Sequence, residues 1–151
     1  VTHDRDEAFN IADQVVVLRG GQVQQTGTPE ELYWSPKTPF VASLLGKTNL
    51  LQVHRNGTNW VSTLGPIGPT QPLETGGQPL ASIRPSQICV SSVPVKSTNQ
   101  QGTVISSRFL GELRELTIAL NTEGELLEVI AHTTAATQFK PGDRVFMSII
   151  P

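Results

Sequence analysis

The pattern of apolar residues along the chain changes abruptly at Gly46. Before that glycine, apolar residues recur at helical spacing behind residues that cap helices well. After it, short alternating runs are separated by clusters of Gly, Pro, Asn and Asp. Many short strands at close spacing are typical of a small barrel or sandwich. The sequence therefore predicts a mainly β fold, a small OB-like β-barrel or sandwich, preceded by an α/β tail.

Local signals divide the tail into a helix, a β-hairpin and two short helices. Gly20 and Gly21 favour a tight turn between two strands, because glycine adopts positive φ without steric cost. Thr28 and Glu31 have the spacing of a capping box, with proline at the first helical position. The expected elements are a helix from Asp4, strands Val15–Leu18 and Val23–Gln25, a helix between Thr28 and Pro36, and a helix Phe40–Leu45.

The second part of the chain predicts eight strands. Its turns fall at pairs and clusters such as Asn56–Gly57 and Lys140–Asp143, which favour tight reversals. The expected strands are Leu50–His54, Trp60–Leu64, Leu80–Arg84, Ile88–Ser92, Gly102–Phe109, Glu115–Leu120, Leu126–His132 and Arg144–Ile150.

Composition narrows the classes of protein further. Eleven basic and thirteen acidic residues give the 151-residue chain a net charge of −2, so no global basic field attracts nucleic acid. One cysteine cannot form an internal disulfide, and no apolar run approaches the length of a membrane span. The chain starts with Val1 rather than methionine, and we expect it to be a segment of a longer protein.

The first 46 residues carry a string of motifs that resembles the end of the nucleotide-binding subunit of an ABC importer. The matching pieces are Val1-Thr2-His3-Asp4, Glu7-Ala8, Ala12-Asp13, Val15-Val16-Val17-Leu18, Gly21-Gln22-Val23, Gln25, Gly27-Thr28-Pro29, Glu31-Leu32-Tyr33, Pro36 and Phe40-Val41-Ala42. The resemblance implies that His3 is the switch histidine of the H-loop, which contacts the γ-phosphate of ATP. An imidazole can donate a hydrogen bond to a phosphate oxygen, so this residue type suits the role.

The printed sequence departs from that family in its nucleotide site. It contains no phosphate-binding loop of the form G-x-x-x-x-G-K-[ST], no acidic metal-binding strand with a catalytic glutamate, and no Ser-Gly-Gly signature. We therefore expect ATP and Mg²⁺ as cofactors of the full-length parent, an ATPase, and no ATP hydrolysis by these 151 residues alone.

The second part resembles the transport-associated OB-type (TOBE) domain of the same importers. The matching pieces are Ile83-Arg84-Pro85, Gly102-Thr103-Val104, Phe109-Leu110-Gly111 and Gly142-Asp143-Arg144-Val145. The two resemblances predict residues 1–46 as the tail of the ATPase domain and residues 47–151 as a regulatory domain. They also imply partners: a second ATP-binding subunit, transmembrane permease subunits and, indirectly, a solute-binding protein, at the cytoplasmic face of the membrane. The substrate is a small solute, with ferric iron slightly preferred over polyamine, sulfate or sugar.

Individual residues leave alternatives open. Arg84 is a candidate anion ligand, or it pairs with a carboxylate or carbonyls and fixes the corner before Pro85. His54 and His132 lack neighbours at ligand spacing, so no metal site is predicted. A stand-alone OB-type module that binds a small oxyanion or oligonucleotide is the competing function. Nucleic acid is not expected as a partner, because residues 47–151 have a charge of only +1, from eight basic and seven acidic groups, and few aromatics.

The tail also predicts association. If residues 1–46 normally pack on an ATPase core, the isolated chain leaves apolar side chains without partners. The side chains concerned are Ala8, Phe9, Ile11, Val15, Val17 and Leu18. Their exposure favours a homodimer, or exchange of the N-terminal segment with a neighbouring copy. The alternative is a monomeric barrel with a disordered tail.

Overall fold

The computed structural model describes residues 5–67, 71–94, 100–122 and 124–150 of the chain, with side chains from residue 7 onward. The helices are α1 (Arg5–Ile11), α2 (Pro29–Trp34), α3 (Pro39–Leu44) and the 3₁₀-helix η1 (Pro85–Gln87). The strands are β1 (Val15–Arg19), β2 (Gln22–Gly27), β3 (Asn49–Asn56), β4 (Asn59–Ser62), β5 (Gly65–Pro66), β6 (Leu80–Ile83), β7 (Ile88–Ser91), β8 (Gln100–Phe109), β9 (Leu113–Thr122), β10 (Glu125–Thr134) and β11 (Arg144–Ile149).

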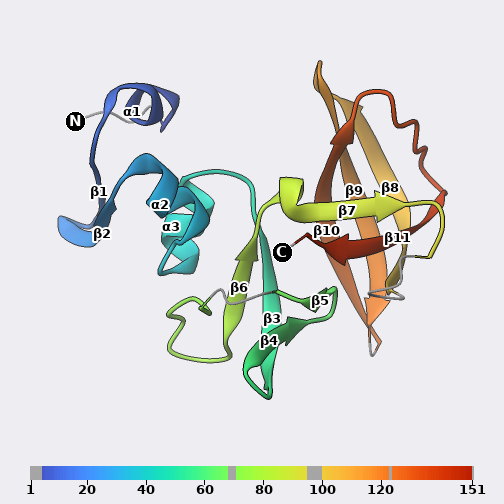
Figure 1. The fold of residues 1–151 in the computed structure, drawn as a ribbon, viewed down its shortest axis with the longest axis horizontal. Coiled ribbons are helices and arrows are strands. Elements are labelled where there is room, and N and C mark those ends of the chain that lie inside the picture. Colours follow the sequence, from blue (N-terminus) through green and yellow to red (C-terminus); the bar gives the residue numbers. More distant parts are fainter. Residues whose placement is uncertain (1–4, 68–70, 95–99, 123, 151) are drawn as a thin grey trace.

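The elements fall into three neighbouring groups along the long axis of the molecule (Figure 1). The helices α1–α3 and the hairpin β1–β2 lie at one end, a four-stranded sheet lies in the middle, and a five-stranded sheet lies at the other end. The mainly β fold with an α/β tail is thus confirmed. Each of the eight strands expected after Gly46 has a counterpart, while the two-residue strand β5 was not expected.

Short-range signals fold the N-terminal group. Gly20 and Gly21 have φ of 57° and 76° and join β1 to β2 antiparallel, as expected. Thr28 caps α2: its Oγ1 accepts from the Glu31 amide at 3.2 Å, and its own amide donates to Glu31 Oε2 at 2.9 Å. Thr38 caps α3 by accepting from the Val41 amide. The cap expected at Asp4 lies outside the described residues.

A small apolar cluster holds the N-terminal group together. Its buried members are Val17, Leu32, Val41 and Leu45, and its half-buried members are Phe9, Val15, Tyr33 and Phe40. The expectation that Phe9, Val15 and Val17 lack partners is therefore wrong, because all three pack in this cluster. The helices α2 and α3 cover the face of the hairpin on which Val17 lies. By contrast, Ile11 and Leu18 are exposed as expected.

The two larger sheets share one core. The four-stranded sheet has the order β5-β4-β3-β6, and the five-stranded sheet has the order β10-β9-β8-β11-β7. The five-stranded sheet curls so that β10 lies close to β7 and η1 (Figure 1). The core joins residues of both sheets: Leu51, Val53, Leu64, Ile67, Ala81, Ile83, Ile88, Val104, Leu116, Ile118, Leu120, Val129, Ala131, Val145 and Met147. One apolar cluster thus lies on each side of residue 46, while the domain boundary itself stays a prediction.

Candidate functional site

The sequence singled out His3 and Arg84. His3 lies outside the described residues, so its switch role stays a prediction. Arg84 follows β6 directly and is the largest of the fully buried side chains, with an exposed fraction of 1%. Its position after a core strand, with Pro85 behind it, directs the guanidinium out of the β core toward α2 and α3.

Main-chain carbonyls surround the Arg84 guanidinium. Nε and one terminal nitrogen donate to the Tyr33 carbonyl at 3.2 and 2.9 Å. The other terminal nitrogen donates to the carbonyls of Ala42, Gly46 and Lys47 at 2.9, 3.1 and 3.2 Å. The guanidinium carbon also lies 4.0 Å from the centre of the Tyr33 ring, a cation–π contact. This is the arrangement in which the arginine fixes a corner, and a ligand role for Arg84 stays a prediction.

A second charged cluster is centred on Glu115, whose side chain is only 8% exposed. Lys47 Nζ lies 2.7 Å from both carboxylate oxygens, and an Arg108 terminal nitrogen lies 3.0 Å from one of them. His132 Nε2 lies 3.4 Å from the other oxygen. Burial raises the pKa of Glu115, but the hydrogen bonds from Lys47 and His132 and the charges of Lys47 and Arg108 outweigh it. The pKa of this carboxyl is therefore lowered.

Sheet register assembles this cluster, and the sequence reasoning missed it. Arg108 on β8 and His132 on β10 are the direct cross-strand neighbours of Glu115 on β9. Side chains opposite each other in an antiparallel sheet meet on one face. The signal in the sequence was the position of Glu115 directly before the mainly apolar segment Leu116–Leu120, where a charged side chain needs partners. His132 was expected to be isolated; the register gives it one carboxylate neighbour.

These clusters do not form a metal site. Within the described ranges, no group of three His, Cys, Asp or Glu side chains could hold a metal ion. Glu115 is instead surrounded by cationic donors, which compete with a metal ion for the carboxylate. Among the described residues, the Glu115 cluster therefore does not offer a set of ligands for Mg²⁺.

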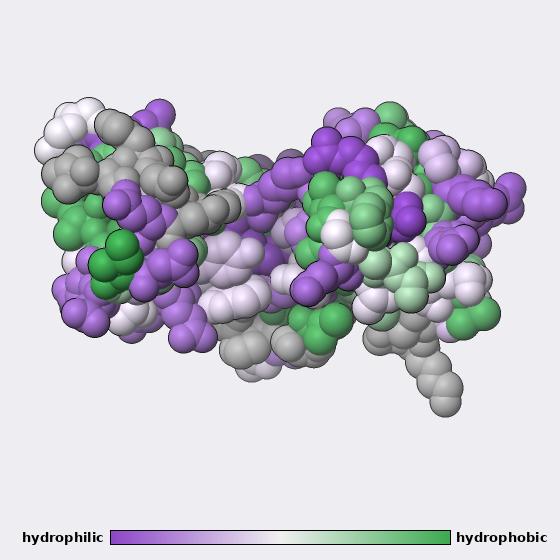
Figure 2. Space-filling model, turned by 90° about the horizontal axis from the view of Figure 1, so that it is seen from above, coloured by the Kyte–Doolittle hydropathy of each residue, from purple (hydrophilic) through white to green (hydrophobic). Residues whose placement is uncertain are grey.

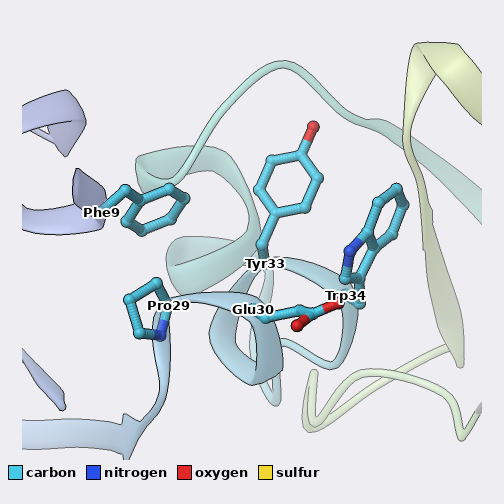
Figure 3. A pocket seen from close by; sticks show the side chains of 5 residues that line it. All are labelled: Phe9, Pro29, Glu30, Tyr33 and Trp34. Atoms are coloured by element: carbon cyan, nitrogen blue, oxygen red, sulfur yellow. The ribbon is translucent and has the colours of Figure 1, made fainter. Parts of the chain in front are cut away.

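An open apolar hollow of about 360 Å³ lies on the N-terminal group (Figure 3). Phe9 of α1 and Tyr33 and Trp34 of α2 line it, together with Pro29 and Glu30. The ring centres of Phe9 and Tyr33 are 6.2 Å apart and those of Tyr33 and Trp34 4.8 Å apart, both edge to face. The aromatic side chains thus pack on one another across α1 and α2.

A second hollow of about 450 Å³ lies where the loop after α2 meets the segment before β6. Trp34, Pro36 and Lys37 line it from one side, and Pro72 and Glu74 from the other. The Glu74 amide donates to the Lys37 carbonyl at 2.6 Å and joins the two walls. The N-terminal group and the strands β3–β11, called here the β-rich part, therefore meet at more than one point.

The chain is similar to a known domain family and to several import ATP-binding proteins. Residues 81–151 match the family model of the TOBE domain. The Fe(3+) ions import ATP-binding protein FbpC 2 of Pectobacterium atrosepticum is 33% identical over 151 residues, which are 99% of this chain and 43% of the relative. The spermidine/putrescine import ATP-binding protein PotA of Bacillus thuringiensis is 31% identical over 149 residues, 97% of this chain and 38% of the relative. The sulfate/thiosulfate import ATP-binding protein CysA 2 of Shewanella oneidensis is 35% identical over 132 residues, which cover 85% of this chain and 36% of the relative.

A curled five-stranded sheet with these matches defines residues 81–151 as a TOBE domain. Over almost its whole length, the chain is similar to ATP-binding subunits of ABC importers. It spans about two fifths of the length of these relatives. Among the described residues, no helix has the length and apolar character needed to cross a membrane.

Proposed function

We propose that this chain is the C-terminal part of the ATP-binding subunit of an ABC importer, which couples ATP hydrolysis to uptake of a small solute. The observation that carries the proposal is the alignment of almost the whole chain, tail and β-rich part together, with import ATP-binding proteins. Residues 1–46 close the ATPase domain in this proposal, and residues 47–151 are its regulatory and dimerisation domain.

Within that proposal, His3 is the residue of this chain that acts in catalysis. Its imidazole donates a hydrogen bond toward the γ-phosphate and helps to hold the attacking water. ATP and Mg²⁺ are bound by other parts of the full-length subunit, because the printed sequence lacks a phosphate-binding loop. These 151 residues alone accordingly have no ATPase activity.

The transported solute is chosen by other subunits in this proposal, which is supported by the different solutes in the relatives' names. The relatives are named for ferric iron, for spermidine and putrescine, and for sulfate and thiosulfate, at similar identity. Ferric iron is the first substrate to test, because the ferric relative aligns over 99% of the chain.

The partners in this proposal are a second ATP-binding subunit and the transmembrane permease subunits, with a solute-binding protein acting indirectly. The subunit works at the cytoplasmic face of the membrane.

The test uses the full-length subunit with its permease. Uptake of radiolabelled ferric iron, spermidine and sulfate identifies the solute, and phosphate release reports hydrolysis. We expect His3→Ala to retain ATP binding and to lose most hydrolysis and uptake. The matched control is His54→Ala, which removes an exposed histidine of β3 and should leave both activities unchanged. Hydrolysis by His3→Ala at the unaltered rate would refute the switch role.

A second assay separates this proposal from the stand-alone binding module. Calorimetry of the 151-residue chain with MgATP should show no saturable binding. Anisotropy of labelled single-stranded DNA should likewise remain flat at low salt, where electrostatic binding is strongest. Saturable binding of DNA or sulfate, together with inactivity of the full-length subunit, would favour the alternative function.

A further inference from the structure

We propose that Arg84 is the joint that makes the α2–α3 segment and the β-rich part of the chain respond as one body. The proposal deepens the proposed function, on which its biological meaning rests. If residues 1–46 close an ATPase domain, a rigid joint at Arg84 transmits movements of that domain to the TOBE domain. The joint itself is a property of the described residues and needs no nucleotide.

The acceptors of Arg84 lie where helices end. Tyr33 is in the last turn of α2, and Ala42 is in the last turn of α3. Gly46 and Lys47 follow Leu45, the C-cap of α3. The last carbonyls of a helix have no partner within it and carry the negative end of the helix dipole. A cation placed there is favourable on both counts. The Arg84 guanidinium, which belongs to the β-rich part, thus caps the C-terminal ends of both α2 and α3.

The planar shape of the side chain matters as much as its charge. The Arg84 donors spread over two directions, toward the Tyr33 carbonyl and toward three carbonyls in and just after the C-terminal end of α3. A guanidinium presents its donors in a fixed fork, whereas a lysine ammonium donates from a single point. The arrangement therefore fixes the relative position of α2, α3 and the end of β6.

Because Arg84 is buried, water cannot readily substitute for the hydrogen bonds of its guanidinium. The exposed fraction of its side chain is 1%. A buried charge is tolerated only when hydrogen bonds compensate its lost hydration. Removing the side chain would take this donor from the buried Ala42 carbonyl and from three part-buried ones. The packing of α2 and α3 on the β-rich part would then loosen.

Two neighbouring contacts extend the joint in both directions. The Lys47 carbonyl accepts from Arg84, while the Lys47 ammonium binds Glu115 on β9, so this residue connects the joint to the five-stranded sheet. On the other side, Gln25 of β2 donates to the Ser35 carbonyl at 3.0 Å and accepts from the Lys37 amide at 2.8 Å. Displacement of the hairpin is thereby passed through α2 and α3 to Arg84 and on to the sheet.

The two tryptophans make the joint measurable in the 151-residue chain. Trp34 is on α2 and Trp60 is on β4, so each reports one part. Trp34→Phe and Trp60→Phe leave one reporter each, and urea unfolding is followed by fluorescence. With Arg84 present, we expect both reporters to give the same midpoint. With Arg84→Met, the Trp34 midpoint should fall below the Trp60 midpoint by about 1 M urea or more.

Two further variants make the test specific. Arg84→Lys keeps the charge without the fork, and we expect it to separate the midpoints as Arg84→Met does. Arg144→Met removes an exposed arginine of β11 and should leave the midpoints together. Midpoints that stay coincident in Arg84→Met, even if both are lowered, would reduce Arg84 to a stabilising residue and overturn the joint.

Hydrogen exchange decides the case if Arg84→Met does not fold. In the unaltered chain, the slowest amides of α3 and of β6 should share one opening free energy and one urea dependence. Independent exchange of the two would refute the joint. None of these measurements involves nucleotide, so their failure leaves the proposed ATPase role standing, and an inactive full-length subunit leaves the joint standing.

Discussion

The side chain of Asn49 pairs with the main chain of Ile130 as a neighbouring strand residue would. Asn49 Nδ2 donates to the Ile130 carbonyl at 2.8 Å, and Asn49 Oδ1 accepts from the Ile130 amide at 2.7 Å. Ile130 lies on β10, an end strand of the five-stranded sheet. One buried amide at the start of β3 thus satisfies part of an exposed strand edge and joins the two sheets. Its Nδ2 also donates to the Ile83 carbonyl at 3.1 Å.

This pairing predicts a large effect of Asn49→Ala. The substitution leaves an amide and two carbonyls without these partners, and each buried unsatisfied group costs about 1–3 kcal/mol. We expect the free energy of unfolding to fall by about 2–4 kcal/mol, measured by urea denaturation of the 151-residue chain with Trp60 fluorescence. The matched control is Asn121→Ala on the exposed end of β9, which should change it by less than about 0.5 kcal/mol. Equal effects of the two variants would rule out a special role for Asn49.

Local signals account for what the sequence predicted well. The glycines of the first hairpin, the capping box at Thr28 and the alternation of the later strands act over a few residues, so their outcome is readable from the chain. Long-range polar contacts are different. Asn49 meets Ile130 across 81 positions and Lys47 meets Glu115 across 68, and both pairs depend on which strands become neighbours. Arg84 was singled out from its place before Pro85, but its helix-end acceptors follow only from the packing of the two parts.

Gly102 marks the tightest approach inside the five-stranded sheet. A Cβ at this position would lie 2.6 Å from Ile118 Cγ2, 2.9 Å from the Ala119 carbonyl oxygen and 2.9 Å from Met147 Cε. The carbonyl cannot move without disturbing the β8–β9 ladder. Gly102→Ala should therefore lower the free energy of unfolding by about 2–3 kcal/mol.

Gly77→Ala is the control for Gly102→Ala. A Cβ at Gly77 meets nothing within 4 Å, and its φ is not positive. We expect this variant to be neutral or slightly more stable, because alanine restricts the unfolded chain. Thermal unfolding by circular dichroism compares the two, and a Gly102→Ala melting temperature equal to that of Gly77→Ala would show that the sheet relaxes freely.

The lowered pKa of Glu115 predicts a pH-dependent contribution to stability. Its carboxylate is favoured in the folded state, so the contribution is fully present above the ordinary value of 4.5 and is lost as the pH falls through the folded pKa. Glu115→Gln should cost about 1–2 kcal/mol at neutral pH, a modest value because Lys47 and Arg108 are more than half exposed.

The measurement is the difference in unfolding free energy between the unaltered chain and Glu115→Gln from pH 7 to pH 3. We expect the difference to be constant down to about pH 5 and to shrink below it. Glu128→Gln, on the exposed side of β10, provides the control and should show a small difference at neutral pH. If the difference in unfolding free energy grew toward low pH, the pKa of Glu115 would be raised in the folded state, and the assigned cause would be wrong.

The exposed face of the first hairpin predicts association of the 151-residue chain. Leu18 and Val23 are cross-strand neighbours, 54% and 61% exposed, and Val16 lies two positions along the same face at 51%. Val17 points to the opposite face and is buried, so the hairpin shows solvent an apolar side of its own. Figure 2 shows apolar side chains among hydrophilic ones on the surface at this end of the molecule. Contiguous apolar surface favours self-association, and a second copy offers the same face as a complementary partner.

Light scattering over a tenfold dilution series should show a dimer that dissociates on dilution. Leu18→Ser combined with Val23→Ser should give the 16.3 kDa monomer at every concentration. Leu126→Ser removes an equally exposed leucine from β10 and should leave the dimer intact, because that residue lies outside the hairpin. A constant mass of 16.3 kDa for the unaltered chain at every concentration would exclude association through the hairpin.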